Sequence, residues 1–182
     1  AGGGPLLDIG PYYLSGLVQL LGPASRVSAT AGKARDTRVI GSGPRAGTEF
    51  EVTVPPTVAA LIEFERGGSA QLVLTFDSAL PRTLLEIGGT LGSAVVPDPN
   101  RFDGSTLLHL LGQNGAEEVP GEGHPASRGT GVLELARAIR DGVPERASGG
   151  FAYHVLDLML SIEDAYTSRQ PVPVESTTDV PP

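Results

Sequence analysis

The sequence predicts an α+β fold in which helices pack on one face of a mostly antiparallel, open sheet of about six strands. Apolar residues recur with a helical period near both ends of the chain, and with a period of two between about residues 26 and 119. Gly- and Pro-rich turns separate the residues with the two-residue period. Strands that follow one another without intervening helices favour antiparallel pairing, with the helices grouped on one layer.

The first helix is predicted from about residue 8 to residue 21. Its apolar residues lie at spacings of three and four, which form one stripe: Leu14, Leu17, Val18 and Leu21. Pro11 is tolerated only in the first turn, so the helix should begin between Asp8 and Gly10. Gly22 and Pro23 end it.

The clearest strands form a predicted hairpin over residues 57–65 and 70–76, joined by a turn at Gly67 and Gly68. Further strands are predicted at residues 26–35, 49–54, 83–87, 94–96, 106–111 and 117–119. The second face of the hairpin is also partly apolar, with Ala59, Leu61 and Val73. A semi-apolar face of this kind predicts burial against a partner, and we expect homo-oligomerisation through the open sheet face.

Two further helices are predicted near the C-terminus. The first carries the stripe Val132, Leu135, Ala136 and Ile139. The second runs over residues 149–168, with Ser148 as its N-cap and one buried side: Val155, Leu158, Met159, Ile162 and Tyr166. The segment 171–182 is expected to be extended and loosely held.

Composition excludes several classes of function. The 182 residues include 13 Lys and Arg against 21 Asp and Glu, a net charge of −8 without a basic run, which argues against nucleic acid or an anionic membrane as partner. Cysteine is absent, and His109, His124 and His154 are not spaced like a zinc pair, so no metal site is expected. No apolar run is long enough to span a membrane, and we expect a soluble, cytoplasmic protein.

No nucleotide-binding motif is present. Gly2, Gly3 and Gly4 follow no strand, and the chain contains no GxGxxG. We therefore expect no cofactor to bind this chain by itself. The chain begins at Ala1 without Met, and we expect it to be a piece of a longer protein.

The stretch GGGPLLDIGPYYLSGLVQLLG resembles the start of the second domain of the Gfo/Idh/MocA oxidoreductases, the glucose–fructose oxidoreductase and inositol dehydrogenase family. In that family a GGG-x-L-x-D-I-G segment leads into a helix, and the Asp is followed four residues later by His in many members or by Tyr in one branch. These positions are Asp8 and Tyr12 here. The segment from Gly129 to Ser176 resembles the closing helices of the family. The stretch FDSALPRTLLEIGGTLGSAVVPDPNRFDG resembles its middle strands.

The resemblance implies a two-domain enzyme. An N-terminal Rossmann domain, absent from this chain, would hold NAD or NADP. Residues 1–176 would form the C-terminal domain that binds substrate and assembles a homodimer or homotetramer through the open sheet face, followed by a loose tail at 177–182. Family members move a hydride between nicotinamide and a sugar, polyol or related secondary alcohol. This chain contains no E-K-P segment with the usual family lysine, so the fragment should be inert alone.

By this resemblance Asp8 and Tyr12 are the catalytic candidates. Tyr13, beside Tyr12, and His154, in the last helix, are weaker candidates for substrate contact. A phenol is a poorer base than imidazole near neutrality, so Tyr12 would need a cationic neighbour to accept a proton. Each residue also has a structural alternative: Asp8 as the N-cap of the first helix, a core position for one of the two tyrosines, and a hydrogen-bonded structural role for His154.

Three functions stay open from the sequence. The chain is the substrate and oligomerisation domain of a nicotinamide-dependent oxidoreductase, a non-catalytic relative that binds a sugar or a protein, or a self-contained binding module.

Overall fold

The computed structural model describes residues 3–80, 82–121 and 128–180. The chain divides into two compact units, one made of residues 1–79 and 148–182 and the other of residues 80–147. The first unit contains all of the candidate site residues.

The first unit is built on a four-stranded antiparallel sheet in the order β10-β1-β4-β5. Its strands are β1 (Ala24–Gly32), β4 (Thr57–Phe64), β5 (Ser69–Thr75) and the short β10 (Val172–Pro173). The predicted hairpin is confirmed as β4 and β5, paired from Thr57 with Thr75 to Glu63 with Ser69. Positive φ angles of 87° and 86° at Gly67 and Gly68 explain why this turn takes glycine.

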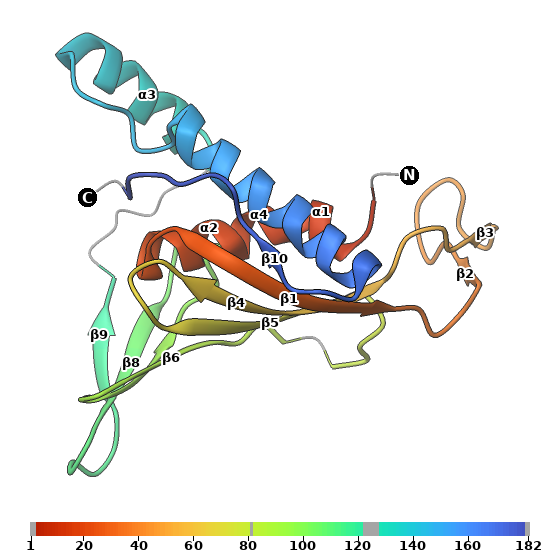
Figure 1. The fold of residues 1–182 in the computed structure, drawn as a ribbon, viewed down its shortest axis with the longest axis horizontal. Coiled ribbons are helices and arrows are strands. Elements are labelled where there is room, and N and C mark those ends of the chain that lie inside the picture. Colours follow the sequence, from red (N-terminus) through yellow and green to blue (C-terminus); the bar gives the residue numbers. More distant parts are fainter. Residues whose placement is uncertain (1–2, 81, 122–127, 181–182) are drawn as a thin grey trace. The chain divides into compact units, whose positions relative to one another are not determined.

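Helices cover one face of this sheet, as predicted. The long helix α4 (Gly149–Ser168) packs on β1, and α2 (Gly10–Leu21) packs beside α4 (Figure 1). The buried strand residues alternate toward these helices, with Val58, Ala60, Ile62 and Phe64 in β4. Their fully buried partners on the helices come from both predicted stripes: Leu14, Val18, Leu158 and Ile162.

The N-terminal helix is broken where the sequence predicts one continuous segment. A single turn, α1 (Pro5–Asp8), precedes α2, and Ile9 lies between them. Pro11 has no N–H to donate to the preceding turn. The next residue, Tyr12, donates its N–H to the Ile9 carbonyl at 3.2 Å. The predicted start between Asp8 and Gly10 is therefore confirmed for α2, while α1 is an additional turn.

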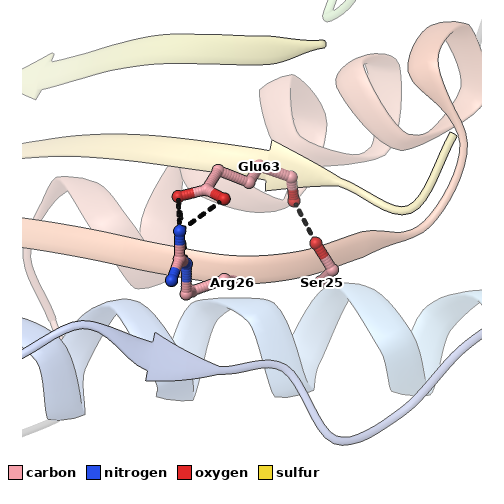
Figure 2. A network of polar contacts seen from close by, with 3 residues as sticks. All are labelled: Ser25, Arg26 and Glu63. Atoms are coloured by element: carbon pink, nitrogen blue, oxygen red, sulfur yellow. Dashed lines mark hydrogen bonds and ion pairs between the residues drawn. The ribbon is translucent and has the colours of Figure 1, made fainter. Parts of the chain in front are cut away.

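The opposite face of the sheet combines polar ends with an apolar middle. At one end Arg26 donates two hydrogen bonds of 2.8 Å to the two Glu63 carboxylate oxygens, and the Ser25 hydroxyl donates to the Glu63 carbonyl (Figure 2). At the other end the Thr57 and Thr75 hydroxyls lie 2.7 Å apart. Between these ends Leu61 and Val73 are 43% and 65% exposed.

The C-terminal segment is held more firmly than predicted. β10 pairs with β1, the Val174 side chain is 8% exposed, and the Ser176 N–H donates to the Asp157 carboxylate at 2.8 Å. The expectation of a loose segment is therefore wrong for residues 172–176. A two-residue strand containing Pro173 leaves too short a pattern for the sequence to reveal it.

The second unit contains another antiparallel sheet, in the order β6-β7-β8-β9. Its strands are β6 (Leu85–Gly89), β7 (Gly92–Val96), β8 (Ser105–Leu110) and β9 (Glu117–Pro120), which confirms four predicted strands. Helix α3 (Thr130–Asp141) belongs to the same unit. Of its predicted stripe, Val132 and Ile139 are each 74% exposed, so this stripe is not buried against the described residues.

The α+β class with antiparallel open sheets is thus confirmed, but the strands are divided among separate sheets. A third, two-stranded sheet pairs β2 (Thr37–Val39) with β3 (Glu49–Glu51). Alternation identifies strands but carries no information about which sheet each one joins.

No helix in the described part of the chain is long and apolar enough to cross a membrane.

Candidate functional site

Glycine shapes the start of the candidate site. Gly4 has φ 93°, and a Cβ atom there would lie 3.2 Å from both the Pro55 carbonyl oxygen and the Val54 Cγ2 atom. A larger residue would be strained in backbone and crowded in space. Gly4 therefore lets the chain turn tightly past residues 54–55 and start α1 against β4 and β5.

The same segment separates a buried side from an exposed side. Leu6 is 5% exposed, and the Cα of Gly10 comes so near to β5 that a Cβ there would be 3.5 Å from Leu74 Cδ1. Asp8 and Tyr12 are exposed, Tyr12 to 40%. The apolar contacts of Leu6 and Gly10 thus fix the helix start, while the carboxylate and the phenol face solvent.

Asp8 does not cap α2. It is the last residue of α1, the N-cap position of α2 is Ile9, and no side chain caps that helix. The capping alternative is therefore wrong, because the extra turn moves Asp8 out of the cap position.

Within the described residues, neither the Asp8 carboxylate nor the Tyr12 hydroxyl has a hydrogen-bond partner or an ion pair. Tyr13 is half-buried, and its hydroxyl also lacks a described partner. The three residues lie together at the junction of α1 and α2. Their polar groups are available to a molecule that approaches this junction.

His154 lies elsewhere, in the core between α4 and the start of β1, with 0% of its surface exposed. Its Nε2 atom accepts a hydrogen bond of 3.0 Å from the Ala24 N–H. Because an amide can only donate, the neutral ring carries its proton on Nδ1, which donates to the Ser176 hydroxyl at 3.0 Å. Both ring nitrogens of His154 are therefore hydrogen-bonded inside the fold. This is the geometry expected if His154 has a structural role and does not contact substrate.

Burial lowers the pKa of His154, although its bond to Ser176 and the nearby charges of Asp157 and Glu65 favour the protonated form. Burial is the larger effect. Protonation would also place a second N–H against the Ala24 N–H and break that hydrogen bond. The fold therefore favours the neutral imidazole.

A dinucleotide cradle is not formed by the residues that the structure describes. Such a cradle requires a strand, a glycine-rich turn and a helix in a parallel crossover, whereas every described strand pair is antiparallel. The described residues therefore do not fit the nicotinamide cofactor that the resemblance implies. The described residues also contain no cluster of three or more His, Asp or Glu side chains that could hold a metal ion.

A second polar location was not predicted from the sequence. A cavity of about 540 Å³ lies between β1 and the end of α4, and its lining includes Tyr166, Arg169 and Gln170. The only signal in the sequence is a cationic residue just after a long helix, which is too common to single out a site. β10 pairs with β1 only at Arg26 and Val27, and the cavity lies beside the next residues of β1, Ser28 to Ala31.

The chain is thus an α+β domain with open antiparallel sheets. It presents a carboxylate, Asp8, and a phenol, Tyr12, to solvent at the junction of its first two helices. The sequence matches the model of the GFO/IDH/MocA C-terminal domain over residues 1–95, slightly more than half of the chain. The chain belongs to this family. No curated protein matches it.

Solved structures show the same fold. An NAD-binding oxidoreductase from Klebsiella pneumoniae is 22% identical with a TM-score of 0.76, over 98% of this chain and 52% of that chain. A levoglucosan dehydrogenase in complex with NADH and levoglucosan is 23% identical with a TM-score of 0.75, over 96% and 51%. An oxidoreductase domain protein from Kribbella flavida is 23% identical with a TM-score of 0.71, over 97% and 52%. The chain therefore spans about half the length of the solved structures that it resembles.

Proposed function

We propose that this chain is the substrate-binding and oligomerisation half of a cytoplasmic NAD(P)-dependent oxidoreductase that acts on a sugar, polyol or related secondary alcohol. One observation carries the proposal: in a domain of this oxidoreductase family, Asp8 and Tyr12 are exposed at a helix start without partners among the described residues. Polar groups buried in a fold nearly always have partners, whereas groups that act on a ligand must be accessible and free before it binds.

In this proposal Tyr12 exchanges a proton with the substrate. Oxidation of an alcohol releases a proton from oxygen, and a side chain within hydrogen-bond reach must accept it. Tyr12 Oη would accept that proton, or donate one to a carbonyl in the reverse direction. Asp8, four residues earlier at the end of α1, would orient the substrate hydroxyl or the phenol. Tyr13 would contribute to substrate binding at the same junction. His154 would act only through the fold around it.

The relatives support this substrate class. One levoglucosan dehydrogenase structure holds NADH with L-sorbose, and another holds NADH with levoglucosan. Because the described part of this chain lacks a parallel crossover, the cofactor would be held by a second half that this chain does not contain. NAD and NADP are equally compatible with the proposal.

A titration of NADH fluorescence with the 182-residue chain tests the division into two halves. We expect no saturable binding in the micromolar range. Micromolar binding would contradict the proposal that the cofactor site lies outside this chain. The coding sequence upstream of Ala1 gives an independent check, since it should encode a GxGxxG after a strand.

The alternative is a non-catalytic relative that binds a sugar or a protein. The observation in its favour is that Tyr12 occupies a position where the resemblance gives His in many members, because a phenol is a weaker base near neutrality. In that case the protein with its upstream sequence would show no NAD(P)-linked turnover of sugars or polyols, and Tyr12→Phe would change nothing.

A further inference from the structure

Strand β1 has one edge that is only partly covered. β4 pairs with β1 over residues 24–32, but β10 pairs with it only at Arg26 and Val27. One more bond, from the Val174 N–H to the Ser25 carbonyl at 2.9 Å, completes the contact with the C-terminal segment. From Ser28 to Gly32 this edge of β1 pairs with no described strand.

The alternation of an antiparallel ladder fixes which groups face the open edge. Ser25 and Val27 direct their main-chain groups toward the C-terminal segment, so Ala29 and Ala31 direct theirs to the same side. Two N–H donors and two carbonyl acceptors thus lie along the edge, repeated every second residue, or about 7 Å. The side chains of Ala29, Ala31 and Gly32 are small or absent, which lets another backbone approach.

The cavity of about 540 Å³ lies against this edge. It is lined by Ser28, Ala29, Thr30 and Ala31 from β1 and by Tyr166, Arg169, Gln170 and Pro171. Arg169 is the only charged residue in this lining, in a chain of net charge −8. Its guanidinium makes no ion pair within the described residues.

The end of α4 holds Arg169 at the cavity. Arg169 has φ 58°, the only positive φ outside glycine in the described chain, and it ends α4 in a left-handed conformation. Nearby, the Tyr166 hydroxyl donates to the Glu163 carboxylate at 3.2 Å, and burial raises the pKa of Tyr166 to about 12. The phenol therefore stays neutral, and Arg169 is the one charged residue of the lining, with the Glu163 carboxylate bonded to Tyr166 outside it.

We propose that the open edge of β1 binds an extended polypeptide segment that carries a carboxylate. The segment would add a strand beside Ala29 and Ala31, and Arg169 would bind its carboxylate. A polypeptide fits better than a small molecule, because its own donors and acceptors repeat at the same two-residue spacing along an extended chain. This site is separate from Asp8 and Tyr12, and it does not depend on the proposed enzymatic function.

The test uses a capped hexapeptide, Glu-Ser-Thr-Thr-Asp-Val, as probe. Its sequence is that of residues 175–180; it is rich in strand-forming residues and carries two carboxylates. Titration into the isotope-labelled chain, followed by NMR, should give saturable shifts at the amides of Ala29 and Ala31. The amides of Ser28 and Thr30, which face β4, should shift much less.

Matched variants separate the two parts of the site. Arg169→Gln should weaken binding about fivefold, the effect of losing one partly exposed ion pair. Arg45→Gln removes the same charge from an exposed loop and should change nothing. Ala31→Pro removes a donor that faces away from β4, a position where an edge strand accepts proline, and should reduce binding further.

Three results would overturn the proposal. One is the absence of saturable shifts at millimolar peptide. Another is equal binding of a peptide that is N-methylated at alternate residues, since such a peptide cannot extend the ladder. The third is a set of shifts at Ala29 and Ala31 on dilution of the chain without peptide, because a second copy would then occupy the edge.

Discussion

At the scale of single residues, polar side chains in this domain fall into two groups. His154 and Ser176 are tied into the fold by hydrogen bonds, whereas Asp8 and Tyr12 make none with the described residues. The first group should matter for stability and the second for activity. Stability measurements on both groups can therefore separate structural from functional roles.

Replacing Asp8 by Ala should change the free energy of unfolding by less than about 0.5 kcal/mol, because its carboxylate is exposed and caps no helix. Ser148→Ala is the matched control. The Ser148 hydroxyl accepts from the Phe151 N–H at 3.1 Å at the N-terminus of α4, and its loss should cost about 1 kcal/mol. Urea unfolding measures both. A loss at Asp8 as large as at Ser148 would restore the capping role.

Stability should fall as the pH is lowered through the range in which histidine titrates. The pKa of His154 in the folded state lies below its unfolded value of about 6.5, so the unfolded chain binds more protons in that range. The contribution of His154 is therefore present above about pH 6.5 and is lost as the pH falls toward the folded-state pKa.

The measurement compares the wild type with His154→Gln at about pH 7.5 and about pH 5.5. The difference in unfolding free energy between the two proteins should shrink at the lower pH. A constant difference would show that His154 has the same pKa in the folded and the unfolded chain. The comparison cancels the carboxylates, which titrate alike in both proteins.

At the scale of elements, helices with similar sequence patterns differ in how they pack. The stripe of α4 is buried, with Leu158 and Ile162 at 0% exposure, but in α3 only Ala138 is buried. Periodicity predicted both helices, and the 149–168 bounds and the Ser148 cap are confirmed. What periodicity could not predict is the surface that covers each stripe, because that depends on the sheet each helix meets.

The two helices should respond differently to the same kind of change. Ile139→Ala in α3 should alter the free energy of unfolding by less than about 0.5 kcal/mol, since Ile139 is 74% exposed. Ile162→Ala in α4 should cost about 2–5 kcal/mol, because it opens a cavity in the core. Denaturant unfolding with a probe in each unit distinguishes the two. A large loss at Ile139 would mean that α3 is packed in solution.

The candidate site could be predicted from the sequence only in part, because its exposure depends on how the first two helices meet the sheet. The DIGPYY segment identified Asp8 and Tyr12, but their exposure follows from Gly4, Gly10 and the break at Ile9. The break follows from Pro11, which the sequence shows, whereas the close approach to Val54 and Leu74 is a tertiary contact. The open edge of β1 could not be predicted either, since it depends on how far β10 extends.

At the scale of the whole molecule, the uncovered sheet face should set the oligomeric state. Leu61 and Val73 form the apolar middle of that face. The Arg26–Glu63 pair lies at one end (Figure 2) and the Thr57–Thr75 contact at the other. An exposed ion pair contributes at most about 1 kcal/mol to stability. The face is therefore suited to a partner that buries Leu61 and Val73.

Sedimentation velocity should show a dimer or tetramer that Val73→Glu dissociates, because a carboxylate in an apolar contact would be buried without a partner. Leu20→Glu, on an exposed position of α2, is the control and should leave association unchanged. A monomer at micromolar concentration would contradict association through this face.

The central claim is that Tyr12 exchanges the substrate proton in an NAD(P)-dependent oxidoreductase. The most direct test measures NAD(P)-linked turnover of sugars and polyols by the protein with its upstream coding sequence. Three forms are compared: the wild type, Tyr12→Phe and Tyr153→Phe. Tyr153 is a control, since it is 64% exposed on α4. We predict that Tyr12→Phe lowers kcat by about 100-fold or more and that Tyr153→Phe retains activity. Equal turnover by the wild type and Tyr12→Phe, or no turnover with any sugar or polyol, would contradict the claim.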